Sequence, residues 1–221
     1  MQFLNRSQAG RKLAEKLLHY AGRDDVIVLA LPRGGVPVGY EVARKLGAPL
    51  DVFLVRKLGV PGYEELAMGA IASNGVQILN DSVLRKLQLS NDEIEDVAAT
   101  ERRELERRER EYRHDRAPVD VRGKIVLLVD DGLATGSTMR AAVAALRKLE
   151  PARIVVAVPV GSPEICKEFE GEADEAICVQ EPEPFYAVGV WYEEFDQVSD
   201  AEVRSLLQKS RSRPNRRNVL R

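Results

Sequence analysis

The sequence has few of the residues from which metal and redox sites are built. Its 221 residues include two cysteines and two histidines. Cys166 and Cys178 lie 12 residues apart in mixed apolar stretches, and no Cys-x-x-Cys pair occurs. A zinc site needs more nitrogen and sulfur ligands than this chain groups together. We therefore expect two reduced core thiols and no protein-held metal or redox centre.

The sequence also lacks long apolar runs and an excess of either charge. No apolar N-terminal segment of the secretory kind occurs, and no run is long enough to cross a bilayer. The formal net charge is -2, so no overall basic surface would hold the protein on nucleic acid. These absences favour a cytoplasmic protein with no membrane partner and make a nucleic-acid partner unexpected. A homodimer is left open.

Apolar runs alternate with segments of helical spacing along the chain. Five runs predict strands, at residues 26–31, 50–55, 124–129, 153–160 and 175–179. Helical spacing predicts helices at residues 5–21, 36–46, 137–149 and 164–169. Continuous apolar runs are typical of strands buried on both faces of a parallel sheet. The sequence therefore predicts an α/β fold with a five-stranded parallel core sheet and helices on both faces.

Charge and chain breakers mark three further segments. Residues 90–116 have a helical pattern, and 13 of the last 17 are charged, which predicts an inserted, solvated helix that serves as a structural prop or an oligomer contact. Residues 208–221 hold six basic residues and no acid, which predicts a disordered tail. Residues 56–76 contain five glycines and prolines, which predict a mobile loop with little regular structure. We expect one domain over residues 1–207, with its core at about 22–180 and a small hood at about 181–207.

The strongest chemical signal follows the third predicted strand. Asp130 and Asp131 are suited to accept hydrogen bonds from vicinal sugar hydroxyls. Three hydroxyl side chains follow around a glycine, namely Thr135, Ser137 and Thr138 around Gly136. The glycine lets the backbone approach an anion, and the next helix offers free N–H groups to a phosphate. A helix cap alone explains one hydroxyl but not this order of residues, so we expect a sugar-phosphate site at the carboxyl edge of the sheet.

This segment resembles the phosphoribosyl-diphosphate-binding motif of the type I phosphoribosyltransferases. The resemblance implies that Asp130 and Asp131 contact the ribose hydroxyls. It also implies that the 5-phosphate is held by Ala134, Thr135, Gly136, Ser137 and Thr138. A Mg²⁺ ion would be held mainly by substrate oxygens and water, near the two acids. Gly132 departs from the family, which usually has a branched aliphatic residue there. Ala-Thr-Gly at residues 134–136 is common in adenine-type enzymes.

Two other loops carry a similar likeness. Arg33, Gly34 and Gly35 follow the first strand, where the family's loop holds the diphosphate through backbone N–H groups, often with a non-proline cis peptide. Arg33 would add charge-assisted hydrogen bonds. Arg56 and Lys57 begin an Arg-Lys-x-Gly and Pro-Gly series similar to that of adenine phosphoribosyltransferases. The resemblance makes these two cations catalytic, since the family's flexible loop closes over the diphosphate.

The base site is less well defined. Adenine enzymes carry a loop glutamate thought to protonate the base, and Ser73 stands at that place here, with Glu64 and Glu65 nearby but mismatched. The general acid is therefore unassigned. Residues 185–192 hold four aromatics, of which Tyr186 or Trp191 would stack on the base in the family's hood. A hydrophobic clasp that holds the terminus is the alternative.

The sequence thus predicts a phosphoribosyltransferase that moves the 5-phosphoribosyl group of phosphoribosyl diphosphate to a nitrogenous base. The resemblance favours a purine-like acceptor. A regulatory protein that senses phosphoribosyl diphosphate without turnover stays open because the loop acid is missing. An RNA-binding regulator of the same fold is supported only by the basic tail. A phosphatase with two aspartates after a strand would want Asp-x-Asp spacing, which this chain does not have.

Overall fold

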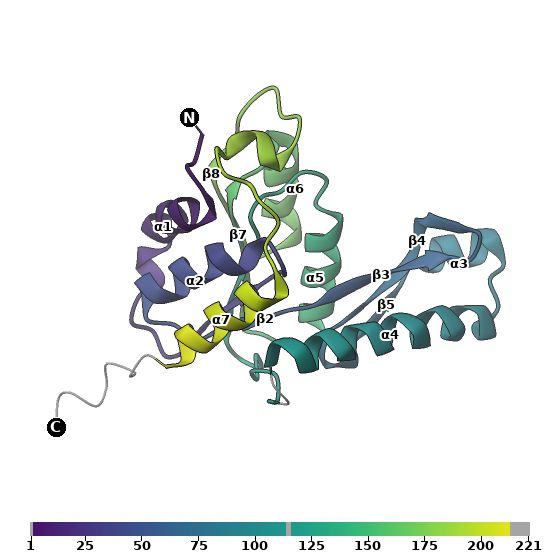
Figure 1. Cartoon of the computed structure of the whole chain (residues 1–221). Coiled ribbons are helices and arrows are strands. Elements are labelled where there is room, and N and C mark those ends of the chain that lie inside the picture. Colours follow the sequence, from purple (N-terminus) through teal and green to yellow (C-terminus); the bar gives the residue numbers. More distant parts are fainter. Residues whose placement is uncertain (1, 114–115, 213–221) are drawn as a thin grey trace.

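A parallel sheet of five strands runs through the body of the molecule, in the order β2-β1-β6-β7-β8 (Figure 1). In chain order these strands are β1 (Val26–Ala30), β2 (Leu50–Val52), β6 (Ile125–Val129), β7 (Arg153–Val160) and β8 (Glu175–Gln180). The computed structural model describes residues 2–113 and 116–212, without the side chains of residues 64 and 65. All residues of β1 and β6 are buried, which confirms the prediction from their continuous apolar runs.

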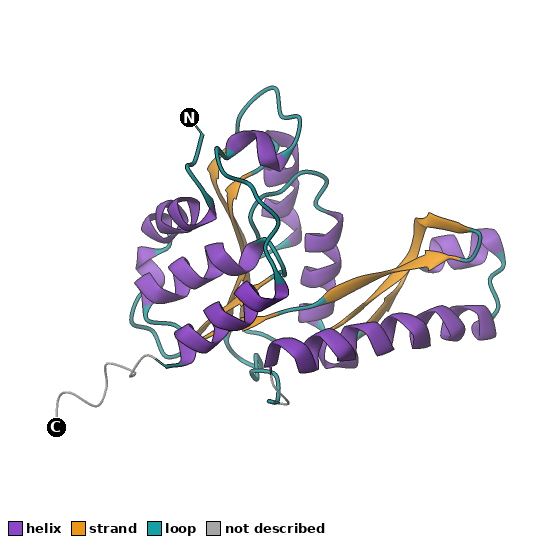
Figure 2. Cartoon of the chain, in the orientation of Figure 1, coloured by secondary structure: helices purple, strands orange, loops and turns teal. Residues whose placement is uncertain are grey.

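Helices cover both faces of this sheet (Figure 2). One face packs on α1 (Arg6–Lys16), α2 (Gly35–Leu46) and α7 (Asp200–Arg211). The other packs on α5 (Ser137–Arg147) and α6 (Pro163–Glu172). Alternate residues of β6 divide between the two layers, with Leu127 in the first core and Val126 and Leu128 in the second. The predicted α/β architecture is confirmed.

The segment after β2 forms an arm that projects from the body (Figure 1). It consists of β3 (Val55–Val60), β4 (Tyr63–Ala72), β5 (Gln77–Leu79), α3 (Asp81–Leu87) and α4 (Asn91–Arg113). The three strands are antiparallel, in the order β3-β4-β5. The expectation of little regular structure in residues 56–76 is therefore wrong. Gly62 makes the turn between β3 and β4 with φ +76°, and Gly69 lets β5 approach, because a Cβ there would lie 2.2 Å from the Ile78 oxygen.

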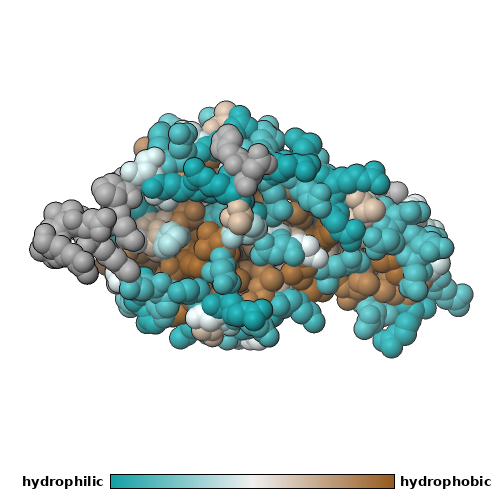
Figure 3. Space-filling view, turned by 90° about the horizontal axis from the view of Figure 1, so that it is seen from below, coloured by the Kyte–Doolittle hydropathy of each residue, from teal (hydrophilic) through white to brown (hydrophobic). Residues whose placement is uncertain are grey.

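The charged helix α4 is more than a solvated prop. Its apolar stripe buries Ile94, Ala98 and Leu105, and it contacts β3, β4 and α7. Figure 3 shows hydrophobic residues between hydrophilic ones along the underside of the molecule. At its C-terminal end, Arg113 forms an ion pair of 3.1 Å with Asp51 of β2, and both side chains are at most 3% exposed. This pair ties the arm to the sheet.

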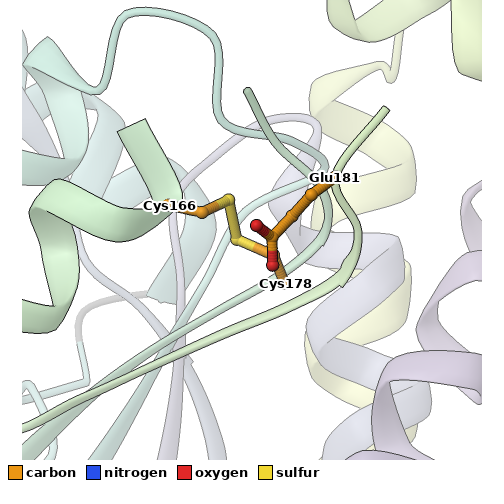
Figure 4. Close-up of side chains that lie close together, drawn as sticks. All are labelled: Cys166, Cys178 and Glu181. Carbon is orange, nitrogen blue, oxygen red and sulfur yellow. A yellow bond between two sulfur atoms is a disulfide. The ribbon is translucent and has the colours of Figure 1, made fainter. Parts of the chain in front are cut away.

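Helix α7 and the cysteines correct two other expectations. The predicted tail began at residue 208, but α7 continues to Arg211, and the remaining tail residues from 213 on lie outside the described part of the chain. Cys166 of α6 and Cys178 of β8 are joined by a disulfide, so the expectation of reduced thiols is wrong (Figure 4). Helix α6 packs against β8, the strand that follows it, and this packing places the Cα atoms of Cys166 and Cys178 6.5 Å apart. No described helix has the length and apolar character to span a membrane.

Candidate functional site

Asp130 and Asp131 lie at the carboxyl end of β6, in the middle of the sheet. The Asp131 N–H donates to Oδ1 of Asp130 at 2.8 Å. Burial and the neighbouring Asp131 carboxylate raise the pKa of Asp130 well above its usual range. Burial also raises the pKa of Asp131, against the opposing charge of Arg6. Both acids therefore sit where hydrogen bonds from a polar ligand would replace lost hydration.

The loop after β1 packs directly on these acids. A Cβ at Gly34 would lie 2.0 Å from Oδ2 of Asp131, and one at Gly35 would lie 2.9 Å from the Cα of Asp130. Only glycine permits so close an approach. The peptide bond between Pro32 and Arg33 is cis, as the resemblance implies. The structure thus brings together two predicted loops that are about a hundred residues apart in the sequence.

Residues 134–136 lead into α5, and all residues from 134 to 138 except Gly136 are exposed. Gly136 has φ +72° at the N-cap position, and no side chain caps the helix there. The Thr135 and Ser137 hydroxyl oxygens lie 3.0 Å apart. Arg140 stabilises this segment by donating hydrogen bonds to the Thr135 carbonyl at 2.8 Å and to the Glu172 carboxylate at 2.7 Å. An uncapped helix N-terminus beside two hydroxyls is suited to bind a phosphate.

Gly132, the departure from the family motif, faces the hood. A Cβ at this position would lie 2.4 Å from Cγ1 of Val188. Val188 begins the 3₁₀ helix η3 (Val188–Trp191). The hood side chain therefore occupies the space that a larger residue at position 132 would need, so the departure fits this chain.

The hood is built from both ends of the described chain. Phe3 forms a parallel bridge with Tyr192, and its N–H donates to the Trp191 carbonyl at 2.8 Å. Trp191 packs beside these aromatic rings, while its buried indole Nε1 has no hydrogen-bond partner among the described residues. This placement favours the clasp interpretation for Trp191. Tyr186 is 80% exposed, so its ring is accessible to a ligand.

Arg6 is a site residue that sequence reasoning missed. Its Nε donates to Oδ2 of Asp131 at 2.8 Å. The Tyr192 hydroxyl donates to the backbone carbonyl of Asp131 at 2.5 Å. Arg6 stands 125 positions before Asp131 at the start of the first helix, and no local pattern in the sequence connects them.

The cations predicted to meet the diphosphate lie in the loop after β1 (Arg33) and on β3 of the arm (Arg56 and Lys57). Arg33 Nη1 lies 4.0 Å from Oδ1 of Asp200, at the start of α7. Arg56 forms an ion pair with Glu101 of α4, and Lys57 is exposed on β3. Arg56 and Lys57 line a groove of about 880 Å³ between β3 and α4, whose described lining includes no residue of the Asp130 loop.

Ser73, which stands at the place of the family's loop glutamate, has a structural role. Ser73 is fully buried, and its Oγ accepts the Leu54 N–H at 3.0 Å. It therefore supports the chain between β2 and β3 and is not directed at a ligand. The side chains of Glu64 and Glu65 lie outside the described part of the structure, and the general acid stays unassigned.

A family model for the phosphoribosyl transferase domain matches residues 2–190. The chain belongs to the phosphoribosyltransferase family. Its five-stranded parallel sheet with helices on both faces is the fold of a type I phosphoribosyltransferase. The match includes both loops that meet at the acids and the first part of the hood.

Two similar proteins match nearly the whole chain, and a third matches part of it. The chain is 46% identical over 208 residues to a Mycobacterium tuberculosis protein whose name as a phosphoribosyl transferase is provisional; 94% of this chain and 47% of that protein are covered. The chain thus spans about half the length of this relative. The crystal structure of TT1426 from Thermus thermophilus is 42% identical, with a TM-score of 0.84, over 95% of this chain and 99% of that one. Bifunctional protein PyrR of Chloroflexus aurantiacus is 34% identical over 129 residues, covering 57% of this chain and 65% of that protein.

Proposed function

We propose that this phosphoribosyltransferase-family protein transfers the 5-phosphoribosyl group of phosphoribosyl diphosphate to a nitrogenous base. One observation carries the proposal: the acids after β6, the glycine loop after β1 and the uncapped N-terminus of α5 meet at one edge of the sheet. The Ala-Thr-Gly series at residues 134–136 favours a purine-like acceptor.

Each part of this edge has a role in the proposed reaction. Asp130 and Asp131 accept hydrogen bonds from the ribose hydroxyls. The N–H groups and hydroxyls of residues 134–138 bind the 5-phosphate, and the backbone of residues 33–35 binds the diphosphate. Bond cleavage at C1 of the sugar builds positive charge on the ribose, which the two acids stabilise. Catalysis then depends mainly on positioning the two substrates.

The residues at this edge fit a magnesium ion that arrives with the substrate. The described residues group three potential ligands only at Cys166, Cys178 and Glu181, where both sulfurs are already in the disulfide. At the proposed site, Arg6 already engages Oδ2 of Asp131. These donors suit an ion held by diphosphate oxygens and water, with few protein ligands. Bound in this way, Mg²⁺ supplies charge neutralisation for the departing diphosphate.

The test is direct. Purified protein is incubated with phosphoribosyl diphosphate, Mg²⁺ and a panel of purine and pyrimidine bases, and released diphosphate and nucleotide product are measured. We expect turnover with at least one base. The double substitution Asp130→Asn with Asp131→Asn should abolish most of it, because hydrogen bonds to charged groups contribute about 1.5–3 kcal/mol each. Asp120→Asn, at an exposed acid, is the matched control.

A sensor without turnover is the second candidate. The observation that favours it is the buried, structural role of Ser73 at the place of the family's loop acid. The sensor would be supported if the assay gave no product from any base while titration calorimetry showed tight binding of phosphoribosyl diphosphate. Absence of binding would contradict both candidates.

A further inference from the structure

Arg6 is held on three sides beside the proposed ribose-binding acid. Its Nε donates to Asp131 at 2.8 Å, and its Nη1 donates to the Asp196 carbonyl at 2.8 Å. Its guanidinium carbon lies 3.9 Å from the centre of the Phe195 ring. Only 12% of its side chain is exposed. The planar group thus has one orientation, fixed by an acid, a carbonyl and an aromatic face.

The ion pair between Arg6 and Asp131 is largely buried. The Asp131 side chain is 16% exposed, so both charges have lost most of their hydration. Removing two charges from water costs several kcal/mol per ion, and an apolar pair would often stabilise a fold equally well. The same oxygen, Oδ2, also packs against the glycine loop, because a Cβ at Gly34 would lie 2.0 Å from it. The contacts therefore fix where the Asp131 carboxylate points.

The segment that carries Arg6 is part of the hood. The Glu193 and Glu194 N–H groups donate to the carbonyls of Phe3 and Leu4, at 2.9 Å each. Phe195 and Asp196, which hold the guanidinium, follow in the same stretch. Arg6 is thus a connection between the hood and the loop after β6.

We propose that Arg6 is a positioning residue for ribose recognition. It engages Oδ2 of Asp131 and so directs Oδ1 toward the ribose hydroxyls. Because the hood also holds Arg6, a shift of the hood would move the Asp131 carboxylate and change its contact with the sugar. This inference rests on the proposed function, since it assigns Asp131 to ribose. It predicts that Arg6 matters for ligands that contain the sugar and not for diphosphate alone.

The experiment compares two ligands by titration calorimetry, phosphoribosyl diphosphate and inorganic diphosphate, each with Mg²⁺. Arg6→Gln should weaken binding of phosphoribosyl diphosphate about tenfold or more. Its diphosphate affinity should stay within about twofold of wild type, which also shows that the variant is folded. Arg11→Gln is the matched control, because Arg11 lies on the same helix with 51% of its side chain exposed and a 3.8 Å pair to Glu41. Arg6→Lys should recover part of the loss, since lysine keeps the charge but not the planar stack.

Three results would contradict the inference. Arg6→Gln could bind phosphoribosyl diphosphate as well as wild type does, which overturns this inference and leaves the proposed function standing. It could lose both ligands equally, which would show a general structural role in place of ribose positioning. A wild-type protein that binds diphosphate but not phosphoribosyl diphosphate would overturn the proposed function and the inference together.

Discussion

Asp130 occupies a position that is unfavourable for a charged side chain. It is buried at the end of β6, next to a second carboxylate, and both effects raise its pKa. The N–H of Asp131 offsets this only in part. A residue retained at such a cost is consistent with binding, because the same burial strengthens any hydrogen bond that a ligand donates to it.

A stability measurement tests this description of Asp130. A carboxyl whose pKa is raised on folding takes up a proton, so the folded state loses stability as pH rises from the unfolded pKa toward the folded one. Asp130→Asn removes the charge and should raise the melting temperature at pH 8, by about 2–4 °C for each kcal/mol gained. The gain should be smaller at pH 4, where the wild-type side chain is mostly protonated. Equal melting temperatures of variant and wild type at pH 8 would contradict the burial argument.

Among the elements, those specified by local pattern were predictable and those specified by distant contacts were not. The run of β6, the following acids and the helix from Ser137 were all predicted, because strand, loop and helix signals follow one another within about 25 residues. Helix α4 of the arm was predicted, but its strands were missed because glycines that serve turns and close strand contacts look like loop residues in sequence. Helix α7 was not predicted, and its last residues were assigned to the tail because Lys209 and Arg211 resemble the basic residues that follow, although Val203 and Leu207 are fully buried. Arg6 was missed because its partner lies 125 residues away.

The arm yields a prediction at the element scale. Closure over a diphosphate would bring Lys57 to a charge that grows as the leaving group departs. Lys57→Ala should therefore lower turnover by more than it lowers affinity for phosphoribosyl diphosphate, while Lys45→Ala, at an exposed position on α2, should change neither. Hydrogen exchange over residues 56–75 should slow when ligand and Mg²⁺ bind. Equal exchange with and without ligand would show that the arm does not close.

In the molecule as a whole, a buried ion-pair network joins the arm to the body. Arg113 donates to Asp51 at 3.1 Å, to the Val52 carbonyl at 2.7 Å and to Glu109 at 2.7 Å. Asp51 also accepts the Val119 N–H at 3.3 Å. The C-terminal end of α4 is thereby fixed to the second strand of the sheet, so the arm has a rigid base from which any movement must begin.

Breaking this network should destabilise the whole protein. Arg113→Gln removes the closer counterion of the buried Asp51 carboxylate and leaves Arg211, whose Nη2 lies 3.7 Å from Oδ1 of Asp51. Removing one partner of a buried ion pair typically costs about 3–5 kcal/mol. Arg110→Gln, at an exposed position on the same helix, should change stability by about 0.5 kcal/mol or less. Urea denaturation of the two variants measures the difference. A loss below about 1 kcal/mol for Arg113→Gln would show that the network contributes little to holding the arm.

The contact between Gly132 and Val188 makes two distant positions share one volume. A larger side chain at position 132 therefore requires a smaller one at position 188. The branched aliphatic residue that the family usually has in the loop would fit only if Val188 were replaced by a smaller residue. Gly132→Val should overpack this space and cost about 1–3 kcal/mol. Combined with Val188→Gly, part of that loss should be recovered, with a coupling of about 0.5–3 kcal/mol in a double-mutant cycle. We expect relatives to keep one large residue across this pair of positions, in the loop or in the hood, and seldom in both.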